Sequence, residues 1–312
     1  MQPPHENWTF VQEFVMMGFT GIKEGHLPLF GFFLVMYLLT LTENSILVLV
    51  VARERRLHTP MYFFLIHLSC LDIWYTSLTV PNMLVGFGSP GSRIISYSAC
   101  LTQLYLFTFL GSTECFLLAA MAYDRYVAIC VPLRYQEMVG RDTCLLLAAG
   151  SWLTGFLTPV LPICFMSQLT FCGPNVIDHF FCDVSPLLVL SRTDVSLKET
   201  VDFLVSLVVL LVSSFVIVVS YVRIITTVLK IHSLGGRRCA FSTCTAHLTV
   251  VSIFYGTLFF MYVCTKVASS VNLNKVVSVF YAIVTSVLNP LIYSLRNSEV
   301  KGALYRVISK RK

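Results

Sequence analysis

The sequence predicts an all-α membrane protein, a bundle of seven transmembrane helices with a short amphipathic helix at its C-terminal end. Of its 312 residues, 56% are hydrophobic and only 12% are charged, whereas a soluble domain usually carries about 25% charged residues. A helix needs about 20 mainly apolar residues to cross a bilayer, and seven runs reach that length. They cover residues 27–52, 60–86, 100–130, 143–166, 199–229, 240–264 and 275–295.

Positive charges indicate how the bundle is oriented. Lys and Arg residues concentrate in the loops after the first, third and fifth runs and in the C-terminal segment, and cytoplasmic loops carry such an excess. We therefore expect residues 1–26 to form an extracellular tail, residues 27–295 the transmembrane domain, and residues 296–312 a cytoplasmic amphipathic helix and tail. Asn7 begins an N-glycosylation sequon in the expected extracellular tail. The charges match no nucleic-acid-binding motif, so nucleic acid is not an expected partner.

An acidic and a basic residue stand side by side near the end of the third run, in MAYDRYVAIC at 121–130. Placing the charges of Asp124 and Arg125 so close to lipid costs free energy, and charged residues in such positions are expected to have a function. The plainer interpretation is a topology anchor, since basic residues are common at cytoplasmic helix ends. We favour a switch, in which an ionic contact holds one helix in place and can release it.

Three of the eleven cysteines fall on the expected extracellular side, Cys100, Cys172 and Cys182. Three thiols cannot all pair within one chain. His179, Cys182 and Asp183 could also be read as a metal site, but three candidate ligands in one loop are a weak signal. We expect no metal centre.

Several longer motifs identify a family. They are LHTPMYFFLIHLSCLD at 57–72, MAYDRYVAIC followed by PLRY at 132–135, Ser220-Tyr221, CAFSTCTAHL at 239–248 and LNPLIYSLRN at 288–297. In this order and spacing the chain resembles the rhodopsin-like G-protein-coupled receptors, and within them the olfactory receptors. The resemblance runs from end to end and implies a receptor that catalyses nothing.

The resemblance implies roles for the polar residues inside the bundle. It pairs Cys100 with Cys182, and it brings the carboxylates Asp72 and Glu114 together in the core with Asn44, Ser286 and Asn289. Two nearby carboxylates do not easily both stay ionised, so one would hold a proton or a sodium ion would sit between them. A hydrogen-bonded packing network is the alternative. The implied switch and G-protein-coupling residues are Asp124, Arg125, Tyr126, Tyr221, His247, Asn289, Pro290 and Tyr293.

The ligand site is expected in the extracellular half of the bundle. Helical spacing from Arg125 predicts four inward residues on the third helix, and similar stripes occur on the later helices, although such a stripe is as typical of core as of a pocket. The candidates are Phe107, Thr108, Gly111, Ser112, Val205, Ser206, Val209, Tyr255, Phe259, Tyr262 and Val279. None is charged, which argues against a cationic amine and favours a small, mostly neutral hydrophobic molecule.

We therefore predict a multi-pass odorant receptor in the plasma membrane, with its N-terminus extracellular. A small volatile odorant would bind, and a heterotrimeric stimulatory G protein of the olfactory type would raise cyclic AMP. Membrane lipid is the other expected partner, and no cofactor is expected beyond the sodium ion. A receptor for a small endogenous metabolite, expressed outside the nose, is the alternative. A transporter is disfavoured because no inverted repeat is visible, and a membrane enzyme because no hydrolase motif is present.

Two positions depart from the family's usual pattern. Glu43 stands before Asn44 where the family usually has Gly, and Arg192 stands where its long loop usually has a cysteine. The resemblance would have paired that cysteine with Cys172, so the loop lacks one covalent link.

We predict that Arg192→Cys restores this link and raises thermal stability or surface expression, since a disulfide typically contributes about 2–4 kcal/mol. Thermal unfolding and surface labelling of the two proteins measure the effect. Equal stability and equal expression would contradict the prediction.

Overall fold

The computed structural model describes residues 11–17, 26–88, 94–171, 175–267, 283, 285–296, 300 and 302. Several predicted features lie outside the described residues. They are the sequon at Asn7, Cys172, Val279, the side chain of Tyr262 and most of the segment 296–312.

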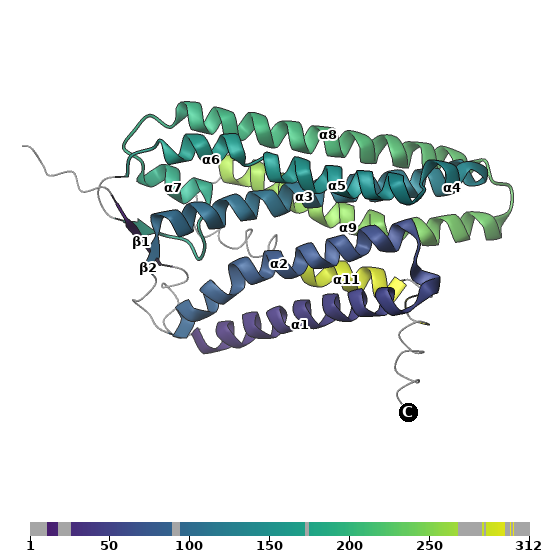
Figure 1. The fold of residues 1–312 in the computed structure, drawn as a ribbon, viewed down its shortest axis with the longest axis horizontal. Helices are drawn as coiled ribbons and strands as arrows, with labels where there is room; N and C mark the ends of the chain where they lie inside the picture. Colours follow the sequence, from purple (N-terminus) through teal and green to yellow (C-terminus); the bar gives the residue numbers. More distant parts are fainter. Residues whose placement is uncertain are drawn as a thin grey trace, which may run out of the picture.

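Long helices make up most of the described chain and confirm the predicted fold class, a seven-helix membrane bundle (Figure 1). Five spans are long and apolar enough to cross a membrane, and a sixth helix has a shorter apolar stretch at Cys244–Phe260. The main helices are α1 (His26–Arg53), α2 (Pro60–Gly88), α3 (Tyr97–Cys130), α5 (Arg141–Leu157), α6 (Val160–Ser167), α8 (Ser196–Leu229), α9 (Leu234–Val267) and α11 (Thr285–Arg296). Shorter helices are η1 (Arg55–Leu57), η2 (Pro132–Arg134), α4 (Tyr135–Met138) and α7 (Val184–Leu190).

The fourth predicted run is divided into two helices. α5 ends at Leu157 and α6 begins at Val160, with Pro159 between them. Proline has no backbone N–H and clashes with the preceding turn, so it interrupts an α-helix but fits just before or at the start of one. The two pieces together still form one span over residues 141–167.

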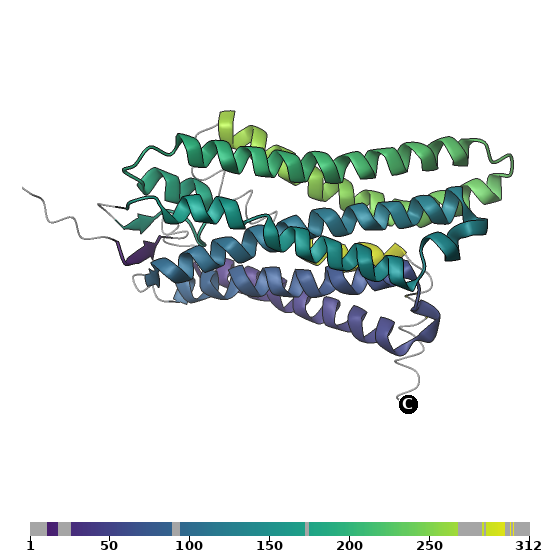
Figure 2. The same cartoon turned by 45° about the horizontal axis from the view of Figure 1, so that its top comes forward.

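Helix α3 is the central element of the bundle. It packs against α2, α5, α8 and α9, and its side chains between Leu110 and Val127 are mostly buried. In both views α1 lies at one edge of the bundle and α8 at the opposite edge (Figures 1 and 2). We call the end where α3 begins the disulfide end and the end where it finishes the Arg125 end.

A small sheet covers the disulfide end. β1 (Glu13–Met16) lies between β2 (Ile94–Ser96) and β3 (Val176–Ile177). It is antiparallel to β2, with Phe14 opposite Ile95, and parallel to β3, with Val15 opposite Val176. No strand was expected from the sequence. The strands join the N-terminal segment to the long loop that precedes α8.

Helices α3 and α5 approach closely at Gly155. A Cβ atom there would lie 2.0 Å from Thr113 Oγ1 and 2.9 Å from the Thr113 backbone nitrogen. Gly150, on the same helix, has no atom within 4 Å of such a Cβ. The absence of a side chain at residue 155 therefore sets the distance between the two helices.

We predict that Gly155→Ala destabilises the bundle by about 1–3 kcal/mol, because the added methyl forces α3 and α5 apart. Thermal unfolding of the purified protein in detergent measures the loss. Gly150→Ala is the matched control and should be neutral or slightly stabilising, since Ala favours helix. Equal stability of the two variants would refute the close approach.

Candidate functional site

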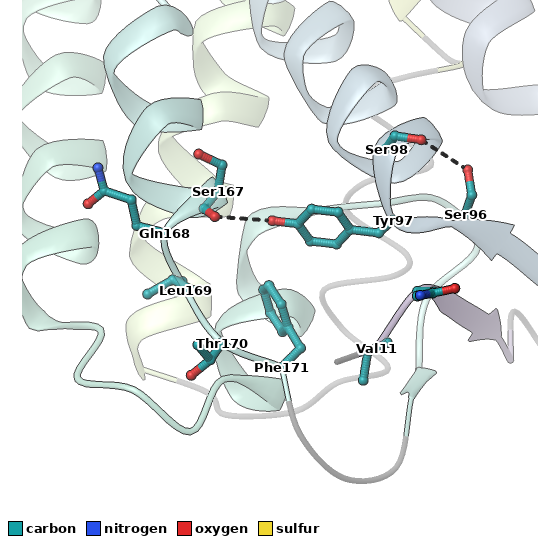
Figure 3. Close-up of a pocket in the computed structure, with 10 residues that line it drawn as sticks. Val11, Ser96, Tyr97, Ser98, Ser167, Gln168, Leu169, Thr170 and Phe171 are labelled. Carbon is teal, nitrogen blue, oxygen red and sulfur yellow. Dashed lines mark hydrogen bonds between the residues drawn. The ribbon is translucent and has the colours of Figure 1, made fainter. Parts of the chain in front are cut away.

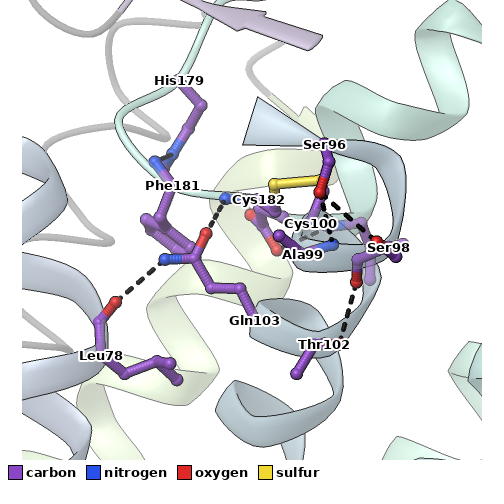
Figure 4. Close-up of a disulfide and its surroundings, with 12 residues drawn as sticks. Leu78, Ser96, Ser98, Ala99, Cys100, Thr102, Gln103, His179, Phe181 and Cys182 are labelled. Carbon is purple, nitrogen blue, oxygen red and sulfur yellow. Dashed lines mark hydrogen bonds between the residues drawn. A yellow bond between two sulfur atoms is a disulfide. The ribbon is translucent and has the colours of Figure 1, made fainter. Parts of the chain in front are cut away.

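The disulfide end is fastened around Cys100 and Cys182, the pair that the resemblance implies (Figure 4). Their sulfur atoms are bonded and their Cα atoms lie 5.5 Å apart. Gln103, one turn further along α3, reinforces the link. Its Nε2 donates to the carbonyl of Leu78 on α2 at 2.9 Å, and its Oε1 accepts from the backbone nitrogen of Cys182 at 3.0 Å. One buried side chain thus joins α2, α3 and the long loop.

Aromatic rings from the loop pack onto α3 beneath this link. Phe181 is 1% exposed, and its ring stacks on Phe107 with centroids 4.8 Å apart. Phe107 also contacts Tyr75 of α2, with ring centroids 4.7 Å apart. His179 and Phe180 stack behind Phe181. The loop therefore covers the α3 residues predicted to line the ligand site.

The predicted ligand residues fall into three groups. Gly111, Ser112 and Val209 are buried, and Phe107, Thr108, Val205, Ser206 and Tyr255 are half-buried. Tyr255 donates a hydrogen bond to Ser213 on α8 at 2.7 Å. Phe259 differs, since it is 71% exposed while its neighbours Phe254 and Leu258 are buried. The structure thus places Phe259 on the outer face of α9. The sequence did not indicate this, because apolar residues surround the helix and their spacing does not identify its inner face.

Two cavities open at the disulfide end, and neither is lined by a predicted ligand residue. One, of about 440 Å³, lies between the N-terminal segment, the start of α3 and the end of α6 (Figure 3). Tyr97 crosses it and donates to the carbonyl of Ser167 at 3.5 Å. The other, of about 350 Å³, lies between α2 and α3 next to Gln103. Because neither cavity reaches the predicted ligand residues, we still favour the apolar interior beneath the loop as the ligand site.

Two charged residues at the start of α8 are paired with each other. Lys198, in the first turns of α8, is 2% exposed and its amine forms an ion pair with Asp202. Asp202 lies one turn before Ser206. The pair is neutral overall, so neither Lys198 nor Asp202 offers a free charge there.

Polar side chains from four helices meet in the middle of the bundle. Asn289 on α11 donates through Nδ2 to Asp72 Oδ2 at 3.2 Å and to Glu114 Oε1 at 3.5 Å. Asn44 on α1 donates to the carbonyl of Ser286 at 3.3 Å. All five residues are at most 4% exposed. The structure thus brings together all the residues predicted to form the ion or proton site.

At the Arg125 end, Arg125 is held by its neighbour in the sequence. Its Nε and Nη2 atoms donate to Asp124 Oδ2 at 3.1 and 2.9 Å. The second oxygen of Asp124 accepts from the hydroxyl of Tyr135 at 2.7 Å. Asp124 is fully buried. Burial and the neighbouring Asp124 charge raise the pKa of the Tyr135 phenol, so it stays a hydrogen-bond donor.

A second contact joins α3, α8 and α9 at the same end. Tyr221 and His247 lie with their rings stacked, and the Tyr221 hydroxyl is 2.6 Å from His247 Nδ1. His247 Nε2 is 3.2 Å from the Leu118 carbonyl. A carbonyl only accepts, so Nε2 carries the proton and Nδ1 accepts from Tyr221. His247 therefore has a complete set of partners on two other helices.

The remaining predicted switch residues are less directly involved. Tyr126 is half-buried and its ring lies 6.3 Å from that of Tyr123. Tyr293 is 3% exposed, and its hydroxyl has no hydrogen-bond partner in the described part of the chain. Pro290 lies inside α11, directly after Asn289. Cys182 is consumed by the disulfide, which removes it as a metal ligand.

Sequence reasoning missed the roles of Gln103, Phe181, Tyr75 and Tyr135. Tyr135 is the last residue of the PLRY motif, eleven residues after Asp124. The signal available was a polar residue near a buried carboxylate that needs a second donor. The other three contact partners far away in the sequence, and no local pattern marks them.

Comparisons with known proteins agree with the geometry. The family model described as "Olfactory receptor" matches residues 33–311. The human protein named olfactory receptor 6Q1 is 69% identical over 310 residues, which cover 99% of this chain and 98% of that protein. Human olfactory receptor 6B1 is 51% identical over 97% of this chain and 96% of its own length. Mouse olfactory receptor 6B9 is 48% identical over 97% of this chain and 96% of its own length.

We predict that Tyr135→Phe destabilises the Arg125 end by about 1–3 kcal/mol, because it leaves one buried oxygen of Asp124 without a donor. Thermal unfolding in detergent measures the loss. Tyr126→Phe is the matched control, since no hydrogen bond of the Tyr126 hydroxyl is seen among the described residues. If both variants unfold at the temperature of the unmodified protein, the hydrogen bond to Asp124 contributes nothing.

Proposed function

The chain belongs to the olfactory receptor family, and from that premise we propose that it couples a small, mostly neutral hydrophobic odorant at its disulfide end to a stimulatory G protein at its Arg125 end. It is an odorant receptor, a multi-pass membrane protein and not an enzyme. The observation that carries the coupling is the closed contact at the Arg125 end, in which Arg125 is bound by Asp124 and Asp124 by Tyr135.

Two arguments support an extracellular disulfide end in the plasma membrane. Disulfides form and persist in oxidising compartments, and the Cys100–Cys182 bond lies at this end. Basic residues concentrate at the other end, as expected for cytoplasmic loops. Those whose side chains the structure describes are Arg53, Arg55, Arg56, Arg125, Arg134, Arg141, Arg223, Lys230 and Arg237.

The proposed ligand chemistry follows from the interior beneath the loop. Phe107 and Val209 offer apolar surface, while Ser112, Ser206 and the Tyr255–Ser213 pair offer hydroxyl groups. Such a lining binds an apolar molecule and orients it by one or two hydrogen bonds. Lys198 and Asp202 form an ion pair, so neither of them attracts a charged ligand there.

Activation would be a population shift between two packings of α9. In the structure His247 joins α9 to α3 and α8. When the end of α9 moves outward, these two hydrogen bonds break and the Tyr221 hydroxyl becomes free to restrain Arg125 after it leaves Asp124. Each hydrogen bond contributes about 1 kcal/mol, which is within the range of allosteric coupling energies.

A G protein would dock where this movement opens the Arg125 end. Leu133, in the turn after α3, is 99% exposed and offers an apolar contact between the basic residues of this end. Arg134 beside it pairs with Glu137 at 3.0 Å. We propose that the stimulatory G protein bound here raises cyclic AMP.

The cluster around Asn289 fits a sodium ion. Asp72 and Glu114 supply carboxylate oxygens, and the buried Oδ1 of Asn44 has no hydrogen-bond partner in the described part of the chain. Oxygen ligands of this kind suit a hard cation. A bound cation or proton would offset the repulsion between the two carboxylates, and its loss would loosen the contact between α2, α3 and α11.

A screen of volatile compounds against cyclic AMP output tests the ligand and the G protein together. The receptor is expressed with a stimulatory olfactory-type G protein, and cells without the receptor are the control. We expect neutral apolar odorants to raise cyclic AMP. A receptor at the surface that responds only to charged compounds would contradict the ligand class.

We predict that His247→Phe raises basal cyclic AMP several-fold at equal surface density, because the ring still packs but both hydrogen bonds to α3 and α8 are lost. Thr249→Val is the matched control, since among the described residues the Thr249 hydroxyl bonds the Thr245 carbonyl of its own helix and no other helix. Unchanged basal output in His247→Phe would show that this contact does not hold the inactive packing.

A further inference from the structure

Helix α8 turns one face into the bundle, and that face begins with a pair of opposite charges. Exposed side chains recur in twos along the helix, at Phe203, Leu204, Leu207 and Val208. The buried and half-buried side chains between them recur at every third or fourth residue, which is the spacing of one helix face. They include Lys198, Asp202, Ser206, Val209 and Ser213.

The charged pair lies directly beside the residues proposed to bind ligand. Ser206 follows Asp202 by one turn of the same face, which is a rise of about 6 Å along the helix axis. Ser206 and Val209 are predicted ligand residues, and Ser213 further along the face accepts a hydrogen bond from Tyr255 at 2.7 Å. A molecule that touches Ser206 is therefore within reach of the charged pair.

The long loop approaches the pair from the disulfide. Asp183 follows Cys182 in the chain and accepts a hydrogen bond from the backbone nitrogen of Val184 at 2.8 Å, which caps α7. Burial raises the pKa of the Asp183 carboxyl, the Val184 N–H opposes that rise, and the negative charge of Asp202 adds to it. Asp202 thus lies near the part of the loop that the disulfide holds.

Each charge of the pair needs the other. Lys198 is 2% exposed, and its amine donates to Asp202. Removing one member of a buried ion pair is strongly destabilising, because the other charge is left without compensation. A ligand of the missing charge would supply that compensation. While the pair is intact, an ionised ligand finds both groups occupied and would lose its hydration without gaining a partner.

We propose that Lys198 and Asp202 determine the charge of the odorants that this receptor accepts. The intact pair disfavours ions and admits neutral molecules. With Asp202 made neutral, Lys198 binds a carboxylate; with Lys198 made neutral, Asp202 binds an ammonium group. This inference rests on the proposed odorant site beneath the loop and names the residues that set its ligand class.

The first test compares straight-chain alcohols, carboxylic acids and amines from butyl to decyl, so that only the head group changes at each chain length. Cyclic AMP is measured at equal surface density of the full-length receptor. Asp202→Asn should lower the half-maximal concentration of the acids at least about tenfold, the effect of one hydrogen bond to a charged group. Lys198→Met should do the same for the amines and leave the acids unchanged.

Two controls separate charge selection from a general change of the site. A loosened site would affect acids and amines alike, so each variant is the control for the other. Glu199→Gln removes the same charge as Asp202→Asn, but from an exposed side chain that forms none of the ion pairs seen among the described residues. It should change no response.

The outcomes distinguish this inference from the proposed function. Receptors that respond to alcohols, without a gain for acids in Asp202→Asn and for amines in Lys198→Met, would overturn the inference and leave the proposed function standing. Receptors that reach the surface and respond to no head group in any form would overturn it too. A silent screen of volatile compounds would then count against the proposed function as well.

A second variant keeps the proposal testable if a single buried charge prevents folding. Lys198→Met combined with Asp202→Leu replaces the ion pair by apolar side chains, a change that is often neutral or stabilising. The double variant should keep the response to alcohols and gain neither acids nor amines. Loss of the alcohol response at unchanged surface density would mean that the pair itself binds odorant. A gain for acids or amines would mean that other groups select charge, and either result would overturn the proposal.

Discussion

The amide of Asn289 is the contact on which the rest of the structure depends. It donates to two carboxyls from two other helices, Asp72 on α2 and Glu114 on α3. In lipid there is no water to satisfy these groups, so they must satisfy one another inside the bundle. The residue that follows, Pro290, removes a backbone donor from α11. The helix is thus held firmly by a side chain at the point where its backbone is weakest.

Helix α3 connects the disulfide end, the central polar cluster and the Arg125 end. Gln103 fastens the loop at the disulfide end, Glu114 joins the central cluster, and Asp124 and Arg125 form the ion pair at the far end. His247 of α9 bonds the carbonyl of Leu118, between the last two of these regions. A change of packing beneath the loop therefore has a continuous route along one helix to the Arg125 end. At Arg192 a backbone hydrogen bond from its nitrogen to the Thr170 carbonyl joins the two arms of the loop.

The helices could be predicted from the sequence because hydrophobic length is a local property. The second run, 60–86, agrees with α2 at Pro60–Gly88, and the fifth, 199–229, with α8 at Ser196–Leu229. The charged pair and the central cluster were found because polar residues stand out in apolar runs. The contacts of Gln103 and Phe181 were missed because they depend on how a loop folds back. The outer position of Phe259 was missed because a helix with apolar residues all round gives no direction.

The small sheet imposes an order on folding during synthesis. Its central strand, β1, is made first, but β3 leaves the ribosome about 160 residues later. At about 5–20 residues per second, that delay is about 8–32 s. Until then Val15 and Met16 have no β3 to pair with, and Cys100 has no Cys182. The disulfide end is therefore the last part of this half of the chain to close. A nascent receptor exposes an unpaired strand edge throughout that interval, and a free Cys100 thiol over the 82 residues that separate it from Cys182.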